Sequence, residues 1–140
     1  MNSSPETGTP PSAAPNGPAA GIVLFGHGSR DPLWRLPIES VAERIRAREP
    51  GVPVRCAYLE LTEPDLATAC DELAAEGVRA LRILPMFLGV GRHAREDLPA
   101  LVDAVRARHP GLRVELRRAV GEEPALLDLL ATLAGGPAPG

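Results

Sequence analysis

Lysine is missing from this sequence, because all 15 basic residues among its 140 are arginine. The 18 acidic residues outnumber them and give a net charge of -3 at pH 7, and only 3% of the residues are aromatic. Proteins that bind nucleic acid need a basic surface, and those that bind single strands also use aromatic rings for base stacking. We therefore expect no nucleic-acid partner.

Cysteine is scarce, and long hydrophobic runs are absent. Cys56 and Cys70 are the only cysteines; each lies in an apolar segment, and they form no CxxC pair. This pattern favours small buried hydrophobic residues over a disulfide scaffold and is compatible with a reducing cytoplasm. No apolar run approaches the roughly 18 residues of a membrane-spanning helix. We expect a cytoplasmic protein with no membrane partner.

The two ends differ in composition from the rest of the chain. Residues 1–20 are rich in Pro, Ser, Ala and Gly and contain no Lys or Arg, so they lack the charged features of signal and transit peptides. We predict a disordered leader at 1–20 and a similar tail at 135–140. Residues 21–134 remain for one domain, which is long enough for a single hydrophobic core.

Hydrophobic patterning divides this domain into alternating elements. Short apolar runs predict strands, and apolar residues at helical spacing predict helices. Thr62 is expected to cap the second helix, with Pro64 in its first turn. The predicted strands are 21–25, 52–59, 79–84 and 112–116, and the predicted helices are 34–48, 62–76, 96–109 and 122–134.

Strands that alternate with helices predict a parallel sheet with helices on both faces. The fold class is therefore α/β: a small, doubly wound sheet of four parallel strands in the order 2-1-3-4, as in flavodoxin-like folds. In such sheets the ligand binds beyond the carboxyl ends of the strands, where the strand order reverses. Here that point lies between the first and third strands.

Three side chains with metal-binding chemistry follow the first three strands. His27, Glu60 and His93 come after strands 1, 2 and 3, so the fold predicts that they meet in one cleft. Two imidazoles and a carboxylate suit a divalent first-row metal ion with open coordination positions. Gly26 and Gly28 flank His27 without side-chain bulk, so a planar ligand could approach it.

Other interpretations of the segment around His27 stay open. It could be a plain tight turn between a strand and a helix, or a phosphate-binding turn. It could also carry the nucleophile of a small hydrolase, with Ser29 beside His27. Ser29 does not lie in a G-x-S-x-G elbow, and no complete GxGxxG or Walker sequence follows the strand, so the sequence favours neither of the last two.

Three longer motifs make a resemblance specific. Residues 26–32 read GHGSRDP, residues 59–64 read LELTEP, and residues 84–99 read LPMFLGVGRHAREDLP. Together and in this order they resemble the short, single-lobe sirohydrochlorin cobaltochelatase/ferrochelatase family of the CbiX/SirB type. The resemblance implies a chelatase lobe that inserts Co²⁺ or Fe²⁺ into a tetrapyrrole, in cobalamin or sirohaem biosynthesis. It implies no organic cofactor, and it implies a homodimer.

The resemblance also assigns roles to residues. His27 matches the histidine that binds the metal and accepts protons from the ring, His93 matches the second metal histidine, and Glu60 matches a carboxylate near the metal. Further positions match those that line the tetrapyrrole: Glu63, Leu88, Gly89, Val90, Gly91 and Arg92. A non-catalytic carrier of metal or tetrapyrrole, using the same histidines, remains the alternative function.

Charged residues around these motifs have simpler expected roles. Sirohydrochlorin carries eight carboxylates. Three arginines are placed where they could pair with them, and a solvated surface position is the alternative for each: Arg30, Arg92 and Arg95. Three acidic residues are expected to cap helices or orient the histidines: Asp31, Glu96 and Asp97. His109 precedes Pro110 and is expected to end a helix.

Overall fold

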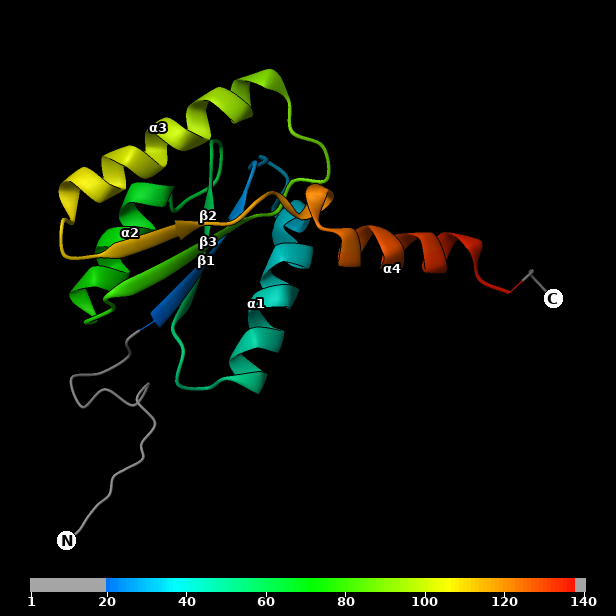
Figure 1. The fold of residues 1–140 in the computed structure, drawn as a ribbon, viewed down its shortest axis with the longest axis horizontal. Helices are drawn as coiled ribbons and strands as arrows, with labels where there is room; N and C mark the ends of the chain where they lie inside the picture. The colour runs from blue at the N-terminus through cyan, green and yellow to red at the C-terminus, as the bar shows by residue number, and fades with distance from the viewer. Residues whose placement is uncertain (1–19, 138–140) are drawn as a thin grey trace, which may run out of the picture.

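A computed structural model describes residues 20–137 of the chain (Figure 1). The predicted leader lies outside the described residues except for Ala20, which begins the first strand. Of the predicted tail, Gly135 ends the last helix, and residues 138–140 lie outside the described part. Within residues 20–137, no helix combines the length and the hydrophobicity needed to cross a membrane.

The predicted alternation of strands and helices is confirmed. Each strand is followed by a helix, and two short 3-10 turns precede the first and last helices. The elements are β1 (Ala20–Gly26), η2 (Pro32–Arg35), α1 (Leu36–Arg48), β2 (Val54–Tyr58), α2 (Leu66–Ala75), β3 (Ala80–Pro85), α3 (Arg92–Arg108), β4 (Arg113–Leu116), η3 (Val120–Glu122) and α4 (Pro124–Gly135).

The four strands form one parallel sheet in the order β2-β1-β3-β4, as the sequence predicted. In this register Leu24 of β1 lies beside Cys56 of β2 and Leu84 of β3. Because β1 is central and covered on both faces, its side chains form a continuous apolar run. The strand order therefore reverses between β1 and β3, at the predicted position.

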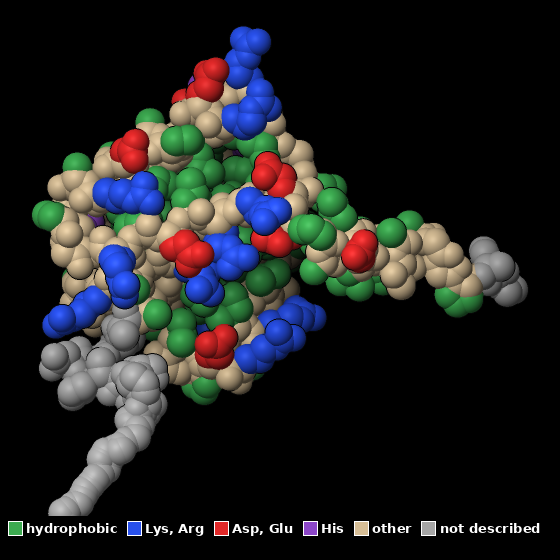
Figure 2. Space-filling view, in the orientation of Figure 1, with side chains coloured by type: hydrophobic (Ala, Val, Ile, Leu, Met, Phe, Trp, Pro, Cys, Tyr) green, Lys and Arg blue, Asp and Glu red, His purple; other side chains and the backbone are tan. Residues whose placement is uncertain are grey.

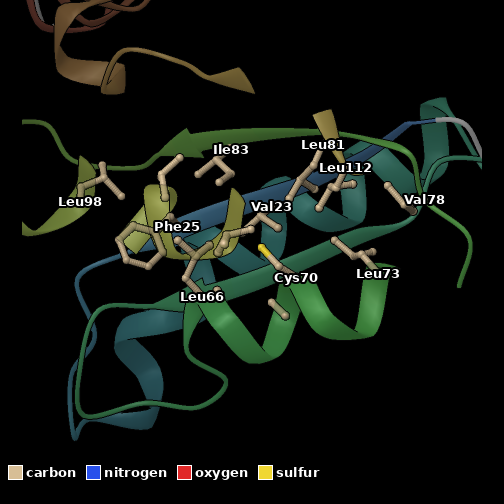
Figure 3. Packing of buried hydrophobic residues seen from close by; sticks show 14 of the residues in the cluster. Val23, Phe25, Leu66, Cys70, Leu73, Val78, Leu81, Ile83, Leu98 and Leu112 are labelled. Carbon is tan, nitrogen blue, oxygen red and sulfur yellow. The ribbon is translucent and has the colours of Figure 1, made fainter. Parts of the chain in front are cut away.

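Helices α2 and α3 cover one face of the sheet (Figure 1). Figure 3 shows Leu66, Cys70 and Leu73 of α2 directed toward Val23 and Phe25 of β1, in the larger of two hydrophobic clusters. Burial raises the pKa of Cys70 to about 12, so this thiol is a protonated core residue, as expected.

Helix α1 covers the other face over β1 and β2. Its buried residues Ile38 and Ala42 pack with Leu24, Val54 and Tyr58 in the second cluster. The prediction of helices on both faces is thus confirmed, while α4 extends away from the body and none of its residues is buried (Figure 1). Within residues 20–137, α1 is therefore the one helix that packs on this face.

The start of α2 differs from the prediction. Thr62 is not the cap; Asp65 caps the helix, with its carboxylate accepting a hydrogen bond from Thr68 N at 2.9 Å. This bond lowers the pKa of Asp65 below its ordinary value of 3.8. The Thr62 hydroxyl binds the backbone of Ser29 instead. The segment 59–64 thus belongs to the loop beyond β2.

The start of α3 also differs. The sequence predicted a loop as far as His93 and a helix from Glu96, whereas α3 begins at Arg92 with Gly91 as its N-cap. Ala94 and Leu98 are both buried, four residues apart, so the helical periodicity already begins within the predicted loop. His93 therefore lies in the first turn of a helix. The other end agrees with the prediction, since His109 is the C-cap of α3.

Candidate functional site

Backbone hydrogen bonds hold the loops after β1 and β2 side by side. Leu59 N donates to Gly26 O at 2.9 Å, and Glu60 N donates to His27 O at 3.1 Å. The first bond belongs to the last parallel pair, Gly26 with Tyr58, and the second joins the two loops just beyond it. The hydrogen bonds between the two backbones therefore make His27 and Glu60 neighbours.

A second set of bonds joins the same loops farther along. Ser29 N donates to Thr62 Oγ1 at 3.0 Å, and the Thr62 hydroxyl donates to Ser29 O at 2.8 Å. One threonine side chain therefore satisfies both backbone groups of Ser29. The sequence predicted Thr62 as a helix cap instead, because threonine is one of the residues preferred at that position.

Gly28 allows the close approach of these loops. Its φ is +104°, in the left-handed region, and a Cβ atom placed there would lie 1.7 Å from Glu60 O. Only a residue without a side chain fits this position. Glycine at 28 is thus required by the backbone of Glu60.

His27 and Glu60 form the central pair of the site. His27 Nε2 lies 3.6 Å from Glu60 Oε2, and each side chain is about half exposed (52% and 51%). Two ligands that each lie about 2.1 Å from one metal ion are between about 3.0 and 4.2 Å apart, depending on the angle between them. The observed spacing suits an ion held between the imidazole and the carboxylate, with its remaining positions open to solvent.

The ring of Phe87 lies against the imidazole of His27. Its ring meets that of His27 edge to face, at 6.1 Å between centroids and 74° between planes, and contacts Phe25 in the same manner. Phe87 is buried and follows β3, so it connects the His27 loop to the core. It was not among the predicted site residues. Its one sequence signal is that it is a large aromatic residue between a strand and a glycine-rich loop.

His93 does not join His27 and Glu60 in this structure. It is 81% exposed, and its Nε2 lies 2.8 Å from Asp97 Oδ2, one helical turn away. Residues 20–137 contain no group of three or more His, Cys, Asp or Glu side chains arranged to hold a metal ion. The structure therefore brings together two of the three predicted ligands, and it gives Asp97 the histidine-orienting position that was expected.

The residues expected to line a tetrapyrrole are mostly exposed. Glu63 lines an open hollow of about 550 Å³ together with Glu60 and the rest of the segment after β2. In the loop after β3, Leu88 is 66% exposed, whereas Val90 packs against the core. The three other positions of this loop are exposed: Gly89, Gly91 and Arg92.

The hydrolase interpretation finds no support in the geometry. Ser29 Oγ accepts a hydrogen bond from Asp31 N at 3.1 Å, and no contact with His27 is found for it among the described residues. Asp31 itself caps the short turn η2 by accepting from Leu33 N. Ser29 and Asp31 therefore accept hydrogen bonds from the backbone of this loop. Asp31 has the capping role that was expected of it.

Comparison with known proteins identifies relatives. The family model CbiX matches residues 21–134. A sirohydrochlorin cobaltochelatase from Methanothermobacter thermautotrophicus is 35% identical over 85 residues, which are 61% of this chain and 59% of that protein. The chain thus aligns with somewhat less than two thirds of this curated relative.

Solved structures agree with this similarity. A candidate cobalamin (vitamin B12) biosynthesis CbiX protein from Marinobacter aquaeolei VT8 matches with a TM-score of 0.72 and 32% identity, over 83% of this chain and 94% of that one. SirB from Bacillus subtilis, solved with Fe³⁺, matches with a TM-score of 0.67 and 25% identity, over 84% of this chain and 48% of SirB.

Proposed function

The chain belongs to the CbiX family, and we propose that it is a sirohydrochlorin chelatase. Such an enzyme inserts Co²⁺ or Fe²⁺ into the tetrapyrrole sirohydrochlorin. The observation that carries the proposal is the His27–Glu60 pair at the carboxyl edge of the sheet, next to the point where the strand order reverses. The names of relatives support both metals, since one is a cobaltochelatase and SirB was solved with iron.

The proposed chemistry is an exchange of one ion for two protons. The divalent metal forms bonds to the pyrrole nitrogens, two N–H bonds break, and both protons leave. Metal and tetrapyrrole are both substrates, so the proposal needs no organic cofactor. His27, with Glu60 beside it, would hold the ion through its imidazole or accept a pyrrole proton. A thiolate would retain a soft metal, and neither cysteine belongs to this site.

We assign His93 to the site as the second metal histidine. When Nε2 donates to Asp97, the Nδ1 atom of His93 carries the lone pair and is available to a metal. Histidines that bind metals commonly donate their other ring N–H to a carboxylate. Because His93 is exposed in the first turn of α3, its side chain is free to adopt another rotamer without movement of the helix.

The carboxylates of the tetrapyrrole would meet the start of α3. This helix has no acidic residue in its first turn, and its N-cap, Gly91, offers no side chain to the free backbone N–H groups. Those N–H groups favour an anionic ligand, and Arg92 adds a positive charge beside them. Glu63 and the loop 88–91 would then border the ring rather than bind its carboxylates.

We also propose that the working unit is a homodimer in the cytoplasm. The chain forms one lobe and matches less than half of SirB, so a single copy would offer one wall of the cleft that the longer chain can build alone. A symmetric pair would supply the second wall. The two free cysteines fit a reducing compartment.

The proposal is tested by following the visible spectrum of sirohydrochlorin under anaerobic conditions, with Co²⁺ or Fe²⁺ in excess over the enzyme. A chelatase converts many equivalents of tetrapyrrole per chain, at a rate proportional to enzyme concentration and above the rate without enzyme. A spectral change that stops at one equivalent per site would instead identify a carrier. No change beyond the rate without enzyme would refute both functions.

A further inference from the structure

A second hollow, of about 490 Å³, lies between the end of β2 and the start of α1; we call it the Tyr58 hollow. Cys56 and Tyr58 both line it, and because they are two residues apart in β2, their side chains lie on the same face of the sheet. That face is the one that α1 covers. His27 instead contacts Phe87, which packs in the cluster on the other face. The Tyr58 hollow is therefore separate from the metal site.

The hydroxyl group of Tyr58 is buried without a partner. Tyr58 is 2% exposed, and its Oη atom has no hydrogen-bond partner among the described residues. Such a group is costly, and most buried hydroxyls in folded proteins are hydrogen-bonded. The nearby Cys56 thiol donates to Ile38 O at 4.0 Å, and its sulfur is a weak acceptor. Burial raises the pKa of Tyr58 to about 12, so the phenol is a protonated donor at neutral pH.

An arginine with free donors lines the same hollow. Arg30 is exposed, and its side chain makes no hydrogen bond or ion pair within residues 20–137. Elsewhere arginines lie beside acidic side chains, as Figure 2 shows for the face over β4, where Arg82 Nε is 3.0 Å from Glu115 Oε1. The guanidinium of Arg30 therefore offers its five N–H groups to a ligand.

A second guanidinium in the hollow is already oriented. Arg35 Nε donates to Glu39 Oε2 at 3.0 Å, which leaves its two Nη atoms as further donors. Glu63 also borders the hollow, but it is exposed, so solvent screens its charge. Two arginines and a phenol make a set of donors that suits carboxylate oxygens.

We propose that the Tyr58 hollow binds a small organic acid, whose carboxylates accept hydrogen bonds from Tyr58, Arg30 and Arg35. Two guanidinium groups favour an acid with two carboxylates over an acid with one. The acid is a ligand distinct from the tetrapyrrole, because the hollow and the His27 ring lie on different faces of the sheet. The bonded pair Ser29 and Thr62 also borders the hollow, so the acid would contact the same two loops that position His27 and Glu60.

Tryptophan fluorescence of the full chain tests this site. Trp34 is the one tryptophan of the sequence, and its ring centroid lies 6.1 Å from that of Tyr58. The probe is sodium succinate, with the ionic strength held constant by sodium chloride. We expect a saturable change in the emission of Trp34, and no such change with succinamide, the uncharged analogue. The absence of a saturable response to succinate, or an equal response to succinamide, would overturn the proposal.

Two variants test the donors. Tyr58→Phe removes only the hydroxyl and should weaken succinate binding at least about 5-fold, and Arg30→Gln should weaken it at least about 10-fold, since each removes a hydrogen bond to a charged group. Arg44→Gln, on the exposed side of α1 and outside the hollow, is the control and should stay within about 2-fold of wild type. Wild-type affinity in either Tyr58→Phe or Arg30→Gln would overturn the proposed site.

The stability of Tyr58→Phe without succinate is an independent check. Because the variant loses a buried hydroxyl that lacks a partner, its urea midpoint should equal or exceed that of wild type. A lower midpoint would show that the hydroxyl already has a partner within the protein, which would contradict the argument for a ligand.

Kinetics with sirohydrochlorin distinguish a free acid from a carboxylate of the tetrapyrrole. Tyr58→Phe should keep the half-saturating concentration of sirohydrochlorin within about 2-fold of wild type, because the hydroxyl is a weak contributor to any other surface. An increase of about 5-fold or more would assign the hollow to the tetrapyrrole and overturn the separate site. If the wild type inserts no metal, the proposed function fails, whereas the fluorescence titration still decides this inference.

Discussion

At the scale of single residues, backbone contacts fix the site more than side-chain contacts do. His27 and Glu60 are placed by hydrogen bonds between their loops, and Gly28 lets these loops approach. Their side chains remain half exposed, which leaves them accessible to a metal ion and a large planar substrate. A rigid backbone with accessible side chains suits the role that we propose for this pair, in which it takes up an ion and releases it again.

Gly28→Ala should disrupt this arrangement. The new methyl group would meet Glu60 O, and the left-handed backbone would be strained, so we expect a loss of about 2 kcal/mol or more in the free energy of unfolding. Urea denaturation measures this loss. Gly111→Ala is the control, because a Cβ atom there meets open space. Equal stability of the two variants would show that the loops do not depend on Gly28.

Changes at His93 and Asp97 should alter the metal concentration that the enzyme needs more than the rate of the chemical step. His93→Ala removes a proposed ligand, so the rate of insertion should fall at low metal concentration and recover in part when metal is in excess. Asp97→Ala should raise the half-saturating metal concentration by about 10-fold, as expected for a residue that orients a ligand. Asp103→Ala, on the same helix, is the control. If the rate of His93→Ala depends on metal concentration as that of wild type does, His93 is not a metal ligand.

The sequence predicted which loops meet at the carboxyl edge of the sheet, but not which contacts hold their side chains in place. His27 and Glu60 follow strands whose order could be inferred from the alternation of elements, so their proximity was predictable. The edge contact of Phe87 and the bonds of Thr62 to Ser29 depend on backbone register at atomic scale. Hydrophobic periodicity carries no information at that scale.

At the scale of elements, α2 illustrates how a polar cap fixes a helix start. The carboxylate of Asp65 accepts from Thr68 N, and this bond lowers the pKa of Asp65. Since the folded pKa lies below the unfolded value, the stabilisation is present above pH 3.8 and is lost as the pH falls through the folded pKa. The cap therefore contributes at neutral pH and fades in acid.

Asp65→Ala should cost about 1 kcal/mol in the free energy of unfolding at pH 7, as other helix caps do. The difference from wild type should shrink as the pH is lowered below about 4, because protonation of Asp65 weakens its cap. Denaturation curves across pH measure both effects. The exposed helix residue Asp103, changed to Ala, controls for the loss of a carboxylate. If the difference in the free energy of unfolding between Asp65→Ala and wild type grows in acid, Asp65 is not the cap of α2.

Helix α3 shows where prediction from periodicity was limited. The sequence placed its start at Glu96, which kept Pro99 near the first turn, where proline is best tolerated. In the structure, α3 begins four residues earlier, and Pro99 lies inside it. The burial of Ala94 against the core decides the start, and that contact depends on tertiary packing. This shift moves His93 from a loop to a helix.

At the scale of the whole molecule, α4 and the site are connected. Gly121, just before α4, donates to the carbonyl of Phe87, whose ring supports His27. The segment before α4 is therefore bonded to the residue whose ring contacts His27. The sequence predicted α4 as a helix, yet it could not show that this helix lies off its own sheet, since the apolar residues that predict a helix do not specify the surface on which it packs.

The most direct test of the proposed site compares the initial rates of metal insertion by wild type and His27→Ala under anaerobic conditions. Circular dichroism confirms that the variant is folded. Both the proposed ligand and the proposed proton acceptor are lost in the variant. We predict a rate at least about 100-fold lower, the scale of general-base catalysis, with no recovery in excess metal. A correctly folded His27→Ala that inserts metal at the wild-type rate would contradict the account.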